Sequence, residues 1–224
     1  MVVDQDRTLA EIVDESPGSA RIFEGRGLDY CCHGDRSLAV ACDEAGIDSA
    51  ELLDELATLG SEPSAEWTAM GPVELADHIE ATHHAFLHTE LPRLAALAAK
   101  VESVHGERHP ELADVAATFG GLKSELEPHL AEEERVLFPA IRQTAVDDGV
   151  TEGTADLIAK LEDEHDSAGA LLAHLRAATG NFLVPADGCA SYQALYEGLA
   201  GLETDTHLHV HKENNVLFPA VTRG

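Results

Sequence analysis

The chain has 224 residues, of which 44% are apolar and only 4% aromatic, so its core must be built mainly from Leu, Ala, Val and Ile, which favours helices over sheets. Its 42 acidic and 14 basic residues give a net charge of −28. A field of this sign repels phosphate backbones and anionic membranes, so we expect no nucleic-acid partner and no membrane partner.

Three further features bear on the compartment. The sequence has no run of about 20 apolar residues that would predict a transmembrane helix. The polar start from Met1 to Thr8 does not resemble a secretory signal. Four cysteines do not resemble a disulfide scaffold. We therefore expect a cytoplasmic protein.

The N-terminal part of the chain, up to Gly60, predicts a small domain of short helices. Thr8 and Glu11 have the spacing of a capping box, which begins the first helix. Ser16-Pro17 has the pattern of an N-cap followed by proline at the first helical position. We expect this second helix to end at Gly25 or Gly27.

Two more helices complete the predicted N-terminal domain. A third is expected from Ser37 to Ala45, with Gly46 as its C-terminal stop. Asp48, with Glu51 three positions later, caps a fourth helix that is expected to end near Gly60.

A linker and a larger domain follow. Gly, Pro and Ser gather in residues 61–71 and the apolar periodicity lapses, which is typical of a linker. We therefore predict domains at 1–60 and 72–224. The second domain has four long amphipathic segments with short connections, which predict an antiparallel four-helix bundle. These segments span 72–103, 110–147, 152–179 and 188–222.

An internal repeat links the second and fourth segments. Residues 129–140 and 209–220 both have the pattern H-x-x-x-E-x-x-V-L-F-P-A. In the other two segments, His84 and His165 are separated by nearly the same offset as His129 and His209, and best keep this register. The bundle is thus predicted to consist of two related helical hairpins, with four histidines at one depth of the core.

The repeat predicts a metal site. Helical residues four apart lie on one face, so His129 can bind together with Glu133, and His209 with Glu213. Adding His84 and His165 gives four imidazoles and two carboxylates, a set that suits two octahedral irons with the glutamates as bridges. Zinc prefers fewer ligands, and manganese remains an alternative. Without a metal, burial of these groups would be costly.

Other polar residues of the bundle are weaker candidates. Glu125, one turn before His129, and Glu164, beside His165, could orient a ligand or relay protons, although surface acids are the alternative. His88 lies one turn from His84 and is a further candidate for such a role. By helical geometry His83, His207 and His211 point away from the ligand face, so we expect them in solvent.

These motifs resemble the iron–sulfur cluster repair di-iron proteins, also called repair-of-iron-centres proteins. Residues 72–224 are similar to their hemerythrin-like domain. The resemblance implies an all-α fold in which a hemerythrin-like bundle follows a small helical domain. It also implies His84, His129, His165 and His209 as iron ligands, with Glu133 and Glu213 as bridges. Val104-His105 fits the family as well, which makes His105 a weak functional candidate.

The segment from Gly27 to Gly34 looks like the Cys-Cys domain of the same family. Adjacent Cys31 and Cys32 form only a strained disulfide ring, so a stable bridge is not expected. One interpretation is two free thiols packed in a small core; the other is a redox or iron-handling pair, with His33. Cys42 and Cys189 have no partner motif and are expected in the core.

The resemblance implies a stress-response protein that repairs iron–sulfur clusters damaged by nitric oxide or oxidants, through iron donation or exchange at two bridged irons. Its partners would be damaged iron–sulfur proteins and the gases nitric oxide and oxygen, with a homodimer as a possible assembly. One alternative is enzymatic reduction of nitric oxide. Another is hemerythrin-like binding or sensing of oxygen or nitric oxide. Reversible oxygen binding favours a site with more histidines than the four predicted here, which counts against a pure oxygen carrier.

Overall fold

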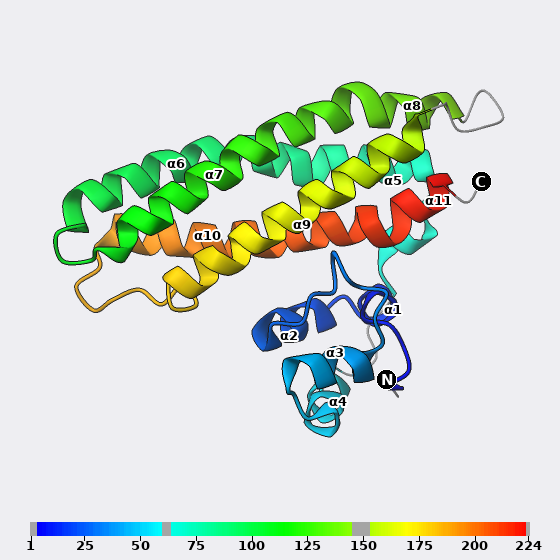
Figure 1. Ribbon diagram of the computed structural model, residues 1–224, viewed down its shortest axis with the longest axis horizontal. Coiled ribbons are helices and arrows are strands. Elements are labelled where there is room, and N and C mark those ends of the chain that lie inside the picture. Colours follow the sequence, from blue (N-terminus) through cyan, green and yellow to red (C-terminus); the bar gives the residue numbers. More distant parts are fainter. Residues whose placement is uncertain (1–3, 60–63, 145–152, 223–224) are drawn as a thin grey trace. The chain divides into compact units, whose positions relative to one another are not determined.

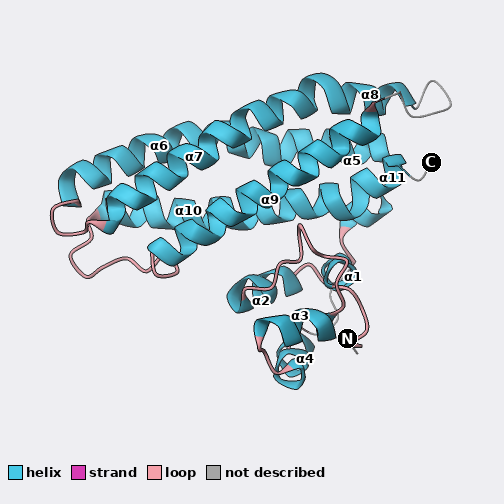
Figure 2. Cartoon of the chain, in the orientation of Figure 1, coloured by secondary structure: helices cyan, strands magenta, loops and turns pink. Residues whose placement is uncertain are grey.

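The computed structural model describes residues 4–59, 64–144 and 153–222. Within these ranges every regular element is a helix, and the only β-type pairing is a single bridge between Thr8 and Ser37 (Figure 2). The predicted all-α fold is therefore confirmed. Contacts divide the chain into two compact units, which are described separately. The first comprises residues 1–76 with 207–224, and the second residues 77–206.

The first unit contains the four predicted short helices, α1 (Leu9–Glu15), α2 (Ser19–Arg26), α3 (Leu38–Ala45) and α4 (Ser49–Ala57). Both halves of the capping box between Thr8 and Glu11 are formed at α1. Asp48 caps α4, as predicted, and Ser37, expected inside α3, is its N-cap, because each side-chain oxygen accepts a backbone N–H of the first turn. Gly27 and Gly46 end α2 and α3 with φ of 68° and 67°, a conformation that glycine adopts without strain.

The predicted N-cap at Ser16 is wrong. Ser16 ends α1 instead, since its N–H donates to the carbonyl of Ile12. Its own carbonyl accepts the hydroxyl and the N–H of Ser19, so one turn separates the two helices and α2 begins later than expected. The short α4 ends at Ala57, and Gly60 lies outside the described residues.

The rest of the first unit comes from two segments, one that precedes the second unit in the sequence and one that follows it. The 3₁₀ turn η1 (Glu66–Ala69) carries Trp67, whose Nε1–H donates to Asp14 at 2.9 Å. The C-terminal part of this unit comprises the end of α10 (Ala190–Lys212), the π-helical turn η4 (Glu213–Leu217) and α11 (Phe218–Thr222). Lys212 Nζ lies 4.7 Å from the centre of the Trp67 ring, a cation–π contact.

The second unit is built from long helices (Figure 1). They are the end of α5 (Pro72–Ile79), the π-helical turn η2 (Glu80–His84), α6 (Ala85–His105), α7 (Glu111–Glu132), the π-helical turn η3 (Glu133–Leu137), α8 (Phe138–Thr144), α9 (Thr154–Ala178) and the first part of α10. Their bounds agree with the four predicted segments, except that the predicted break at Asp148-Gly149 lies outside the described residues.

Side-chain contacts establish that neighbouring helices are antiparallel. Between η2–α6 and α10, His83 contacts Asp205 while Lys100 contacts Ser191. Between α7 and α9, an ion pair joins Glu132 to Lys160, and Asp114 pairs with His174. The core between the helices is aliphatic with a few aromatic rings, and includes Leu87, Leu94, Val115, Phe119, Leu122, Leu172, Leu195 and Leu199.

Three π-helical turns interrupt the long helices. In each, the residue after the turn donates its N–H five positions back: Ala85 to Glu80, Phe138 to Glu133, and Phe218 to Glu213. A proline follows the second and third turns, at 139 and 219. In a regular helix its ring would press on the carbonyl four positions earlier, and the wider turn relieves that clash.

Across the described parts of the chain, we find no helix with both the length and the apolar character needed to cross a bilayer.

Candidate metal centre

The second unit buries four of the predicted ligands. His84 ends η2, His129 lies in the last turn of α7, Glu133 begins η3, and His165 lies midway along α9. None is more than 3% exposed, and Glu133 is completely buried. Helical spacing places His129 and Glu133 on one face, while the antiparallel packing of α9 brings His165 to the same depth.

The ligand atoms converge on the Glu133 carboxylate. Its Oε2 lies 3.4 Å from Nε2 of His84 and 3.4 Å from Nε2 of His129. The Nε2 atoms of His129 and His165 face each other at 3.1 Å. Two nitrogens about 2.1 Å from one octahedral metal would lie about 3.0 Å apart, so the arrangement fits a shared cation.

Two further carboxylates orient the imidazoles from outside. His129 donates its Nδ1–H to Glu164 at 2.9 Å, and His84 donates its Nδ1–H to Glu134 at 3.1 Å. Each bond fixes the tautomer, so that the lone pair of Nε2 faces Glu133. His88, half exposed, donates to the same oxygen of Glu134 at 2.7 Å.

Both outer carboxylates are held ionised. Partial burial raises the pKa of Glu134, but hydrogen bonds from the His88 and His84 rings outweigh it, so the pKa lies below its ordinary value. The pKa of Glu164 is lowered in the same way, because the hydrogen bond from His129 and the nearby Lys160 outweigh its desolvation. Anionic partners increase the basicity of the imidazoles as metal ligands.

The Val-Leu-Phe-Pro motif after Glu133 has a structural role at this site. The ring of Phe138 stacks on His84 with centroids 5.3 Å apart. Pro139 follows the π-helical turn that starts at Glu133. The motif thus contacts His84 through Phe138 and favours the π-helical turn at Glu133 through Pro139. Such turns often mark functional sites. The donor set of imidazoles and a buried carboxylate therefore fits a metal cation.

The remaining predicted ligands lie in the first unit. His209 is buried near the end of α10, and Glu213, completely buried, begins η4. Their Nε2 and Oε1 atoms are 3.0 Å apart. The pair has the same relation to its π-helical turn and proline as His129 and Glu133, so the repeat seen in the sequence extends to the backbone.

The other candidates have different surroundings. Glu125 is exposed and accepts a hydrogen bond from Ser167, while Glu164 contacts His129. His105 lies at the opposite end of α6 from His84. Glu134 was not among the predicted residues, although it directly follows the predicted ligand Glu133 in the sequence.

The prediction that His83 and His211 face solvent is wrong, because each is buried and has an acidic partner. His83 pairs with Asp205 at 2.9 Å, and His211 with Asp14 at 3.0 Å. Those partners are distant in sequence, so helical geometry alone could not identify them. His207 is partly buried and lies 3.6 Å from Glu24.

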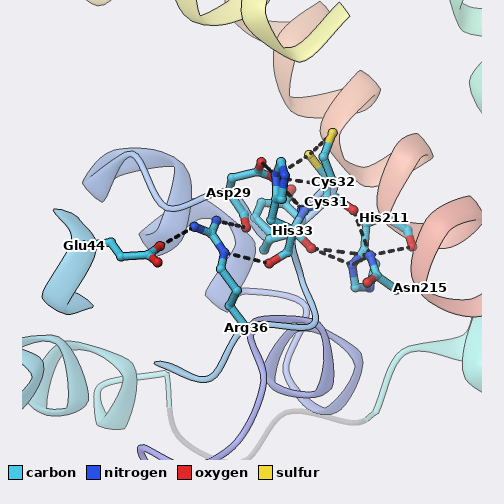
Figure 3. A network of polar contacts seen from close by, with 9 residues as sticks. Asp29, Cys31, Cys32, His33, Arg36, Glu44, His211 and Asn215 are labelled. Atoms are coloured by element: carbon cyan, nitrogen blue, oxygen red, sulfur yellow. Dashed lines mark hydrogen bonds and ion pairs between the residues drawn. The ribbon is translucent and has the colours of Figure 1, made fainter. Parts of the chain in front are cut away.

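The Cys-Cys loop forms a second polar cluster (Figure 3). The Sγ atoms of Cys31 and Cys32 are 3.8 Å apart and not bonded, and one donor atom from each lies within 4.8 Å of an Asp29 oxygen. Asp29 accepts the backbone N–H of both cysteines and pairs with His33 at 2.6 Å. Cys32, burial and Asp29 together raise the pKa of the Cys31 thiol.

The C-terminal π-helical turn holds this loop within the first unit. Asn215 donates its side-chain amide to the carbonyl of Cys31 at 2.9 Å, and the His211 ring lies 3.4 Å from the carbonyl of Tyr30 (Figure 3). Gly34 is required here, since a Cβ would lie 2.4 Å from the Tyr30 carbonyl and 2.8 Å from Asn215. The loop is therefore fixed by the same turn that carries Glu213. Asn215 was not predicted.

Comparisons with known proteins agree with this picture. The hemerythrin HHE cation-binding domain matches residues 75–221, and a domain of unknown function, ScdA_N (DUF542), matches residues 5–60. A probable iron-sulfur cluster repair protein of Haemophilus influenzae is 36% identical over 95% of both chains. The iron-sulfur cluster repair proteins YtfE of Enterobacter sp. and Escherichia coli O157:H7 are each 34% identical over 98% of both chains. The chain therefore belongs to the family of iron–sulfur cluster repair proteins that join an N-terminal ScdA_N domain to a hemerythrin cation-binding domain.

Proposed function

We propose that this protein repairs damaged iron–sulfur clusters with a centre of two irons held by His84, His129, Glu133, His165, His209 and Glu213. The observation that carries the proposal is the buried Glu133 carboxylate, which lies 3.4 Å from the inward nitrogens of both His84 and His129. The names of the relatives give the client class, damaged iron–sulfur proteins.

The two halves of the repeat support the number of metals. Glu133, between His84 and His129, is suited to bridge two cations, and Glu213 is its counterpart in the second copy. Bound iron would supply exchangeable metal and the electrons needed for chemistry with nitric oxide. The protein residues fix the imidazole tautomers and orient the rings through Glu134 and Glu164, and burial keeps the proposed ligands out of solvent.

The Cys-Cys loop is proposed to contact the damaged client. Two tetrahedral thiolate ligands about 2.3 Å from one metal would lie about 3.8 Å apart. The Sγ atoms of Cys31 and Cys32 are already 3.8 Å apart. Cys32 is partly exposed, whereas Cys31 is buried. The pair thus has one accessible thiol that could reach an iron of the client.

The experiment compares the wild-type chain with Glu133→Ala/Glu213→Ala. We expect about two irons per chain and near-ultraviolet oxo-bridge absorption in the wild type, both lost in the variant, because the bridging carboxylates are gone. Recovery of a nitric-oxide-damaged [4Fe–4S] dehydratase should fall with the iron. The matched control is Glu125→Ala/Glu162→Ala, which removes two exposed carboxylates from helices of the bundle.

Equal iron in all three proteins would contradict the proposed centre. Turnover of nitric oxide to nitrous oxide with a reductant, without recovery of the dehydratase, would favour nitric oxide reduction instead. A reversible oxygen spectrum would favour hemerythrin-like binding.

A further inference from the structure

A cysteine and a histidine meet in the second unit where α6 ends and α10 begins, at the end of α6 that lies away from His84. Cys189, expected in the core, is instead exposed and directly precedes α10. Its Sγ lies 3.2 Å from Nε2 of His105, the last residue of α6, which is only 4% exposed. The prediction for Cys189 was wrong because its partner is distant in sequence and is brought close only by the packing of α6 against α10.

The hydrogen bonds of His105 fix the position of its proton. Arg108 donates from its guanidinium to Nδ1 of His105 at 3.2 Å, so Nδ1 must be the acceptor. The ring proton of the neutral imidazole then resides on Nε2, which donates to Sγ of Cys189. The edge-on contact between His105 and Tyr192, with centroids 5.4 Å apart, holds the ring in this orientation. This arrangement stabilises a thiolate.

The backbone supplies further donors to the same sulfur. Backbone N–H groups of Tyr192 and Ser191, at the start of the 23-residue α10, face the Cys189 side chain. The Tyr192 N–H and then the His105 ring lower the pKa of Cys189 to about 7. A Cβ at Gly188 would lie 2.7 Å from a methyl group of Val184 and 3.0 Å from the carbonyl of Pro185, so the turn before Cys189 favours glycine.

We propose that Cys189 is a modification site that forms a mixed disulfide with a small, carboxylate-bearing disulfide such as glutathione disulfide. The Cys189 thiolate attacks one sulfur, the original S–S bond breaks, and the other half leaves as a thiolate that takes up a proton. Cys189 is oxidised and the small disulfide is reduced, so the electrons balance; an added thiol reverses the step. Arg108 is paired with Asp187 at 3.1 Å, so the cation left to meet a carboxylate of the reagent is Lys100, which contacts Ser191 at 2.9 Å.

The test follows the reaction of the whole chain with glutathione disulfide, cysteine by cysteine, by peptide mass spectrometry across pH. We expect the Cys189 rate to reach half its maximum near pH 7. At pH 7 a thiol of pKa about 7 is about fiftyfold more ionised than one at the ordinary 9.0, and its weaker nucleophilicity leaves a net advantage of about fivefold. The charged and titratable groups around the thiol are Lys100, His105, Arg108, His109, Glu111, Asp187 and Tyr192.

Two variants separate the role of His105 from general packing. His105→Phe keeps a ring beside Tyr192 but loses the donor, so the midpoint should rise by about 0.5–1 pH unit. His105→Gln retains an N–H donor and should stay closer to the wild type. Cys189→Ser must abolish the modification at this position. Faster modification of Cys32 than of Cys189, or a wild-type midpoint near 9 that His105→Phe does not move, would overturn the proposal.

Discussion

Single side chains outside the ligand set determine how the imidazoles present their nitrogens. Glu164 and Glu125 lie on neighbouring helices and were equal candidates for this role, but only Glu164 contacts His129. We expect Glu164→Gln to weaken iron retention by about 10–100-fold, since the neutral amide polarises the imidazole less and fixes its tautomer less firmly. Competition with a chromophoric iron chelator measures the change.

Glu125→Gln is the matched control, because it removes the same charge from an exposed position and should leave iron retention unchanged. Equal losses in the two variants would mean that overall charge, rather than the hydrogen bond to His129, governs iron binding.

At the scale of the helix, a π-helical turn contains or directly follows the proposed ligands of three segments, whereas α9, which carries His165, has none. Pro139 follows η3 and disfavours a regular helix there, because its ring would meet the carbonyl of Arg135. We expect Pro139→Ala to lower iron retention several-fold, since a regular helix then competes with the π-helical turn that begins at Glu133. The far-ultraviolet circular dichroism should stay at wild-type strength.

Pro92 provides a control of the same type. It lies inside α6, is exposed, and follows no π-helical turn closely, so Pro92→Ala should not change iron retention. If Pro139→Ala bound iron as tightly as the wild type, the turn would be maintained by packing alone.

At the scale of the whole molecule, our proposal gives iron binding to the six His and Glu residues and contact with the client to the Cys-Cys loop. Cys31 and Cys32 are not among the six proposed ligands. We therefore expect Cys31→Ser/Cys32→Ser to keep its iron and optical spectrum, yet to lose most of its ability to reactivate a nitric-oxide-damaged dehydratase, by about tenfold or more, because serine hydroxyls are poor ligands for iron.

Cys42→Ser controls for loss of a buried thiol in the same small domain, since Cys42 is 1% exposed and packs in α3. It should retain repair activity. Full repair by the double variant would remove the thiol pair from the proposed function.

Most helix starts and the main candidate ligands follow from local patterns in the amino-acid sequence. Helix starts at Thr8, Ser37 and Asp48 follow from hydrogen bonds over two or three positions, which the local sequence specifies. The pairing of His129 with Glu133 is likewise a matter of one helical turn. Because the motif recurs from His209 onward, the two related halves also follow from the sequence.

The contacts between side chains of different helices could not be predicted from local patterns. Glu164 rather than Glu125 orients His129, Glu134 contacts His84, and Cys189 reaches His105. The burial of His83 and His211 against distant acids belongs to the same class. Local periodicity specifies which face of a helix a residue occupies, but it contains no information about the helix packed against that face. Those contacts depend on the register between antiparallel helices, which the whole core sets.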